Sequence, residues 1–158
     1  MNTLKKLLMG FGALFIGFIV FFTVLESGSK GFKVNNEALI VKFMSDLTAS
    51  WDMQDVASLT SNEFMEQLIT AEGRHYLKVF SAMGAVESIS DMELADLVMD
   101  ARMNTGLFIF KAKFEQGPAL VKVILVEKSG ESRIQALDII PANTPELETT
   151  SSSNLRLL

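Results

Sequence analysis

The chain of 158 residues contains no cysteine, one histidine, one tryptophan and one tyrosine. The lack of cysteine excludes disulfide bonds and thiolate metal sites, so the folded part depends on buried apolar surface for its stability. A single histidine excludes zinc motifs with paired histidines, and we find neither a phosphate-binding glycine loop nor a nucleophile elbow. We therefore expect no cofactor and favour a non-catalytic protein, with an enzyme as the alternative.

Basic residues are also scarce after the first part of the chain. Residues 35–141 contain six Lys and three Arg against sixteen Asp and Glu, a formal net charge of −7. Such a surface repels the phosphate backbone of DNA or RNA. Nucleic acid is therefore not an expected partner.

Residues 7–25 form the one long hydrophobic run, and thirteen of its 19 residues are Leu, Ile, Val or Phe. As a helix this run is about 28 Å long, close to the roughly 30 Å hydrocarbon core of a bilayer. The sequence thus predicts an N-terminal transmembrane helix. Membrane-spanning positions include Leu7, Phe11, Phe15, Ile19, Phe22 and Leu25.

A cleaved secretory signal is the alternative interpretation, with a cleavage site at Ser27-Gly28-Ser29. Signal peptides usually have apolar regions of about 7 to 15 residues, so the length favours a retained anchor. Lys5 and Lys6 precede the run, which is the usual layout of a signal-anchor. We expect a single-pass protein of the inner (cytoplasmic) membrane with a periplasmic domain.

Membrane lipid is thus one expected partner. Ala13 and Gly17 have the small-x-x-x-small spacing that lets two membrane helices approach closely, which is compatible with a homodimer. Small residues are also common in membrane helices without any such role.

The remaining sequence divides by composition. A short N-terminus (1–6) and the membrane helix (7–25) are followed by a Gly/Ser/Lys linker (26–34). One domain of ordinary size covers residues 35–141, and a polar tail (142–158) is expected to be disordered.

Helices are predicted in the first half of the domain. Asn36 is a candidate N-cap for a helix over 37–50, whose apolar residues recur at three-and-four spacing. Asp52 is a candidate cap for one short helix, and either Ser61 or Asn62 for a second that begins at Glu63. Gly73 marks a predicted kink or break before a helix over 74–83 with Gly84 as its C-cap. The apolar positions of the first helix are Ile40, Phe43, Met44 and Leu47.

The second half has the two-residue period of strands. Residues 108–115 alternate, 119–128 are apolar on both faces, and 132–140 follow a turn at Ser129-Gly130. Residues 86–99 favour an earlier bent strand. We therefore predict an α+β fold in which helices pack on one face of a curved antiparallel sheet of three or four strands.

Several local patterns resemble the nuclear-transport-factor-two-like (cystatin-like) cone superfamily, in particular its small membrane-anchored bacterial members. The matching segments are residues 43–47, 51–56 and 59–64 in the helices and 114–119 and 121–131 in the strands. The resemblance implies a cone fold over about residues 35–140. It leaves the activity open, because the superfamily includes isomerases, dehydratases, carrier domains and non-catalytic assembly modules.

Few residues qualify for chemistry inside such a cone. If strand alternation holds, Asp138 shares a face with Ile134 and Ile140 and is a candidate base, although it could equally bond backbone donors or water. Tyr76 is a candidate ligand-binding residue, although a core tyrosine beside an exposed histidine is the favoured interpretation. Its neighbour His75 points about 100° away on the same helix, so the two do not form a facing pair.

Two further patterns favour structural interpretations. The acidic residues of 87–100 do not have EF-hand spacing, so no metal site is expected there. Seven methionines between Met44 and Met103 are typical of core filling, and also of adaptable binding surfaces. The leading hypothesis is a membrane-anchored binding or assembly module of the cell envelope with a protein partner. The alternative is an apolar-ligand-binding or isomerase-like domain that uses the cone cavity.

Overall fold

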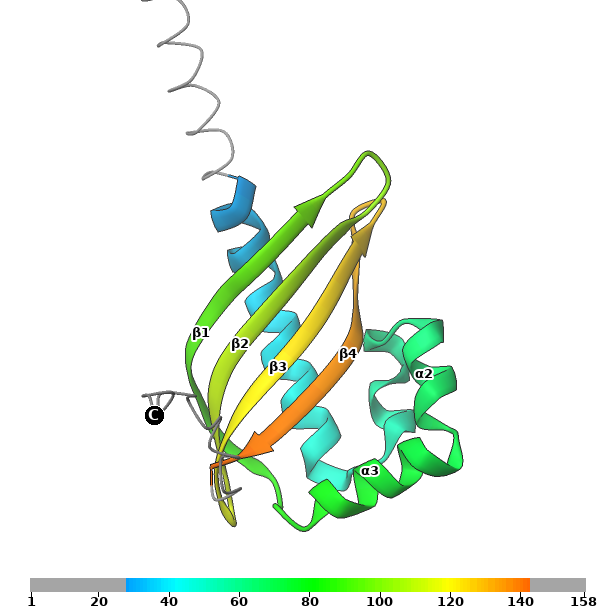
Figure 1. Cartoon of the computed structure of the whole chain (residues 1–158), viewed down its shortest axis with the longest axis vertical. Helices are drawn as coiled ribbons and strands as arrows, with labels where there is room; N and C mark the ends of the chain where they lie inside the picture. The colour runs from blue at the N-terminus through cyan, green and yellow to red at the C-terminus, as the bar shows by residue number, and fades with distance from the viewer. Residues whose placement is uncertain (1–27, 143–158) are drawn as a thin grey trace, which may run out of the picture.

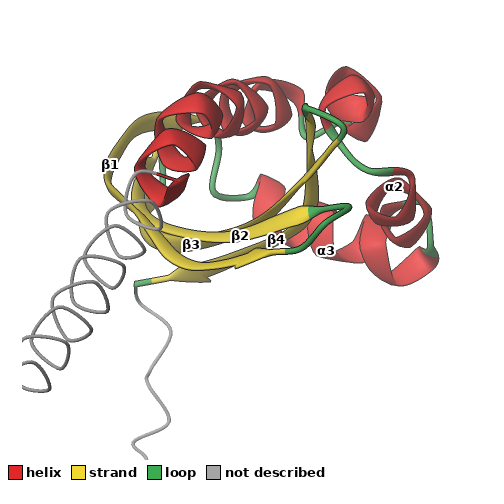
Figure 2. Cartoon of the chain, turned by 90° about the horizontal axis from the view of Figure 1, so that it is seen from above, coloured by secondary structure: helices red, strands yellow, loops and turns green. Residues whose placement is uncertain are grey.

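The computed structural model describes residues 28–142, which form an α+β domain with a four-stranded antiparallel sheet (Figure 1). A long helix over residues 28–50 lies across one face of that sheet (Figure 2). The predicted membrane segment 7–25, with Lys5 and Lys6, and residues 143–158 lie outside the described part. Within residues 28–142, no helix is both long and apolar enough to span a bilayer.

The long helix begins before the predicted position. Residues 28–34, expected to be a linker, are helical. Phe32 is only 5% exposed, and its ring stacks on Phe108 with centroids 6.1 Å apart. Burial of this ring outweighs the low helix propensity of Gly28 and Gly31, which composition alone had associated with a linker.

Asn36 is therefore not the N-cap. It lies inside the long helix, is 2% exposed, and its side-chain amide donates to the Phe32 carbonyl oxygen at 2.8 Å. The predicted apolar face of this helix is confirmed, because all four of its residues are fully buried: Ile40, Phe43, Met44 and Leu47.

The two short helices and their caps are also confirmed. Asp52 caps the 3₁₀ helix η1 (Met53–Leu59), and its carboxylate accepts from the Gln54 backbone amide at 2.9 Å. Ser61 caps α2 (Asn62–Leu68) in the same way. Side-chain acceptors at these positions satisfy amides that have no partner within the helix.

The predicted kink at Gly73 is wrong. The chain breaks earlier, at Thr70, whose hydroxyl caps α3 (Ala71–Ser81), and Gly73 lies inside that helix. A Cβ atom at Gly73 would be 2.4 Å from the Gln67 carbonyl oxygen. This glycine therefore permits the close approach of α2 to α3.

Four strands form a meander in the order β1-β2-β3-β4. They are β1 (Val86–Met99), β2 (Asn104–Phe114), β3 (Gly117–Lys128) and β4 (Glu131–Pro141). The turn between β3 and β4 is where it was predicted, with positive φ at Ser129 (54°) and Gly130 (77°). Two consecutive positive φ angles match the twist of the flanking strands.

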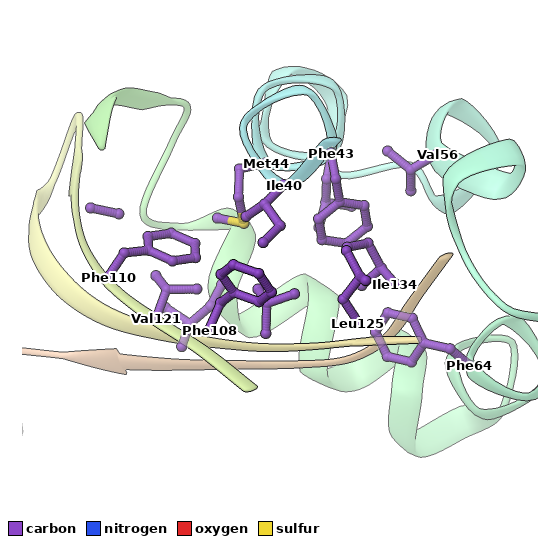
Figure 3. Close-up of a cluster of buried hydrophobic side chains, with 14 of the residues drawn as sticks. Ile40, Phe43, Met44, Val56, Phe64, Phe108, Phe110, Val121, Leu125 and Ile134 are labelled. Atoms are coloured by element: carbon purple, nitrogen blue, oxygen red, sulfur yellow. The ribbon is translucent and has the colours of Figure 1, made fainter. Parts of the chain in front are cut away.

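The core lies between the long helix and the inner face of the sheet (Figure 3). Phe108 and Phe110 point from β2 toward Ile40 and Phe43 of the helix (Figure 3). These four residues and Phe114 are at most 1% exposed. Aromatic rings and a methionine thus occupy the space that a ligand would need between the long helix and the sheet.

Candidate functional site

The interior formed by residues 28–142 contains no buried ionisable side chain. Among the described residues the buried polar side chains are Asn36, Thr48, Thr60 and Ser61, and each makes a hydrogen bond that supports the backbone. Acid–base catalysis needs a titratable group held close to the substrate. The packed interior of the described domain does not supply one.

Asp138 does not face the interior, so that prediction is wrong. The pairing of β3 with β4 shifts between Ile124 and Leu125, which leaves Gln135 as an extra residue in β4. One extra residue reverses the alternation that follows it. Ile134 and Ile139 are therefore both buried, while Asp138 is exposed on the opposite face, where it pairs with Lys122 in register.

Tyr76 lies at the outer edge of β4. Its hydroxyl accepts from the Ile139 amide at 3.1 Å and donates to the Leu137 carbonyl oxygen at 3.4 Å. The Ser61 backbone amide donates to the Ile134 carbonyl oxygen of the same edge strand at 2.8 Å. The α2–α3 segment thereby covers backbone groups that an edge strand would otherwise leave open.

These contacts determine the electrostatics of the tyrosine. Burial raises the pKa of Tyr76 above its ordinary value, and the nearby negative charge of Asp138 raises it further, against the opposing effect of the Ile139 hydrogen bond. A neutral hydroxyl with both hydrogen-bonding functions engaged by the backbone is suited to structural support. The structure thus brings the two sequence candidates close together, but at the sheet edge and outside the core.

The remaining candidates lie on the surface. His75 is exposed, as are Glu87 and Asp91, which form ion pairs with Lys113 and Lys111 across β1 and β2. No cluster of three or more His, Cys, Asp or Glu side chains within residues 28–142 could hold a metal ion. The acidic residues of β1 therefore act as a solvated, ion-paired strand face.

Trp51 is a feature that sequence reasoning did not single out as a site. It follows the long helix with φ of 56°, an uncommon conformation for a bulky residue. Its ring stacks on Phe114 at 6.4 Å, and its Nε1 donates to the Gly84 carbonyl oxygen at 3.2 Å. One sequence feature could have identified Trp51: it lies between the end of the long helix and the Asp52 cap, where the chain must change direction.

Beside Trp51 there is an open cavity of about 580 Å³ between η1, α2 and α3. Its floor contains the buried side chains of Met53, Leu68 and Leu77, and the charged groups of Arg74 and Lys78 lie at its rim. This volume is in the range that small ligands occupy in proteins, about 300 to 1,000 Å³.

The face of the sheet opposite the long helix, called here the outer face, carries apolar side chains in the open. No described helix covers it in Figure 2. Leu120, Ile124 and Ile140 are 38%, 36% and 36% exposed, and strand register places Leu107, Ile109 and Ala136 beside them. Large exposed apolar patches mark interaction surfaces in folded proteins.

Comparison of the chain with protein-family models, curated proteins and solved structures found no match.

Proposed function

We propose that this protein is a single-pass, membrane-anchored binding or assembly module of the cell envelope, with a non-catalytic domain of the nuclear-transport-factor-two-like cone type. The hydrophobic run of residues 7–25 supplies the anchor, and the domain lies on the periplasmic side. The outer face of the sheet is the binding surface. Its partner is a protein.

The observation that carries this proposal is the contrast between the two faces of the sheet. The inner face is filled, since Phe43, Phe108 and Phe110 are each at most 1% exposed. The outer face exposes Leu120 and Ile124, and no helix within residues 28–142 covers it (Figure 2). In such a domain, side chains fill the interior and apolar surface is exposed elsewhere. This arrangement is suited to binding a partner and poorly suited to enclosing a substrate.

The anchor is tested on the full-length chain in native membranes. We expect alkaline washing to leave the protein in the membrane pellet, with Lys5 and Lys6 still present in the mature chain. Release of the full-length chain into the wash, or mature chains that begin near Lys30, would contradict the anchor.

The orientation is tested with a single cysteine, because the natural sequence contains none. Glu66 is exposed on α2, so Glu66→Cys provides an accessible thiol. In spheroplasts, a membrane-impermeant maleimide should label this thiol as fully as it does after lysis. Labelling only after lysis would place the domain in the cytoplasm.

The binding role is tested by site-specific photo-crosslinking from the outer face, with a matched position on α2 as control. A photo-reactive side chain at Ile124 should form a discrete protein adduct in native membranes, whereas the same group at Glu66 should not. Equal adducts from both positions, or none from Ile124, would argue against the outer face as the binding surface.

The cavity beside Trp51 supports a second candidate function, the binding of a small apolar molecule with a negative group. Arg74 and Lys78 at the rim suit an anion, and the floor is apolar. Trp51 is the only tryptophan, so its fluorescence reports this cavity directly. A saturable change with decanoate but not with decanol, lost in Lys78→Ala, would favour this function, and no change would exclude it for such ligands.

A further inference from the structure

The apolar patch of the outer face has a charged pair at its centre. Strand register places Leu107, Ile124 and Ala136 in one row across β2, β3 and β4, and Lys111, Leu120 and Ile140 in another. The row between them contains Ile109, Lys122 and Asp138. A positive and a negative side chain thus lie next to each other, with exposed apolar residues on both sides.

Lys122 and Asp138 do not form an ion pair with each other. They are cross-strand neighbours, but the ion pairs found within residues 28–142 do not include one between them. Lys111 and Lys113, by contrast, are already paired with Asp91 and Glu87. The two central charges therefore remain available to a partner.

The arrangement is complementary to itself. A two-fold axis that lies between the two sheets, parallel to the strands and over the line between β3 and β4, would bring Lys122 of one copy onto Asp138 of the other. The reverse contact would form at the same time. Interfaces of this isologous kind use the same patch on both subunits. Opposite charges at the centre also set the register of the two faces and disfavour other partners.

The contact about such an axis is small. β3 and β4 have 12 and 11 residues, and β4 is the edge strand of the sheet. The axis therefore places β3 of each copy over β4 of the other, and at about 3.3 Å per residue and about 4.8 Å between strands the overlap covers roughly 350 Å². A typical stable interface buries about 800 Å² on each partner, so the two copies form a weak contact whose register is set by the charged pairs.

We propose that the outer face packs against the outer face of a second copy of this chain, as a two-fold dimer with two reciprocal Lys122–Asp138 ion pairs. This inference rests on the proposed binding role and names the partner as the chain itself. It does not require the membrane anchor, which the alkaline wash tests separately.

Cysteine crosslinking of the full-length chain in native membranes tests the contact. Ile124→Cys lies beside the proposed axis, and Glu66→Cys on α2 is the matched exposed control. A short bis-maleimide should convert the first variant into a dimer of twice the monomer mass and leave the second monomeric. Equal dimer from both positions overturns the proposal. A crosslink from position 124 to a different protein also overturns it, while retaining the binding role.

Charge reversal tests the register. In the Ile124→Cys background, Lys122→Glu and Asp138→Lys should each lower the dimer yield about tenfold or more, because like charges then meet at the axis. When the two variants are co-expressed with different tags, the mixed dimer should recover. A folding defect within one chain could not be cured by the other chain, so this recovery is specific to contact between chains.

Two results would refute this arrangement. One is wild-type dimer yield from each charge variant alone, which would mean that the chains associate elsewhere, for example through Ala13 and Gly17 of the predicted membrane helix. The other is failure of the co-expressed pair to recover while both variants keep the wild-type unfolding midpoint.

Discussion

At the scale of single residues, Tyr76 connects the helical segment to the sheet. Its one hydroxyl satisfies an amide and a carbonyl of β4, an edge strand that would otherwise present open backbone groups. From the sequence, Tyr76 was a candidate for ligand binding, with a core tyrosine as the favoured interpretation. Its actual contacts depend on where α3 packs, and no local pattern specifies that position.

Tyr76→Phe should lower the free energy of unfolding by about 1–3 kcal/mol, because the Ile139 amide loses its acceptor while it stays partly buried. The free energy of unfolding is measured by urea unfolding of the full chain in detergent, monitored through the fluorescence of Trp51. His75→Phe at the neighbouring exposed position is the control and should change stability by less than about 0.5 kcal/mol. Equal effects of the two changes would contradict the bridging role.

The ionisation of Tyr76 has a predicted direction. Burial raises the folded-state pKa above the ordinary value, so this tyrosine stabilises the fold fully below about pH 10 and loses that contribution as the pH rises through the raised pKa. Because Tyr76 is the only tyrosine, tyrosinate absorbance reports it alone. We expect a higher titration midpoint in the native chain than in urea. Coinciding midpoints would mean that the hydroxyl is solvated.

Gly73→Ala should destabilise the domain by about 1–3 kcal/mol, since the new Cβ would lie 2.4 Å from a backbone oxygen of α2. Gly31→Ala is the matched control: this glycine is also helical, and a Cβ atom there would have no atom within 4 Å. The control should stabilise the chain by about 0.5–1 kcal/mol. Thermal unfolding of both variants distinguishes a packing effect from helix propensity.

At the scale of elements, the long helix and β4 show how tertiary contacts override local signals. The glycines of residues 28–34 are typical of a linker, yet Phe32 packs on Phe108 and the segment is helical. In β4, alternation predicts the wrong face for Asp138 because Gln135 is an extra residue in the strand. Both errors arise from pairings with distant residues, which a local pattern does not contain.

Phe32→Ala should lower stability by about 3–5 kcal/mol, the usual cost of removing a buried ring. Val34→Ala, two residues later and 69% exposed, should change it by less than about 0.5 kcal/mol. Denaturant unfolding of the full chain compares the two. Similar small effects would mean that residues 28–34 behave as the linker that their composition indicates.

At the scale of the whole molecule, the distribution of apolar side chains separates two kinds of function. The inner face is filled by rings and branched chains, whereas the outer face exposes apolar side chains that no described helix covers (Figures 2 and 3). A filled interior predicts that small apolar probes find no room in it.

Saturating benzene should therefore leave the thermal unfolding midpoint of the full chain unchanged. Leu125→Ala removes a fully buried side chain and should cost about 2–5 kcal/mol. Benzene should raise the midpoint of this variant, because a dry cavity lined by apolar groups binds such probes. Stabilisation of the wild-type chain would instead reveal a ligand cavity between the long helix and the sheet.

The amino-acid sequence by itself determined the α+β class, the caps at Asp52 and Ser61, the apolar face of the long helix and the turn at Ser129 and Gly130, because each depends on residues close together in the chain. Only the tertiary structure decided that the long helix starts before Asn36 and that Asp138 lies on the outer face beside Lys122. Those outcomes depend on ring packing and strand register between distant segments, and the free energy of such contacts exceeds the local preferences that oppose them.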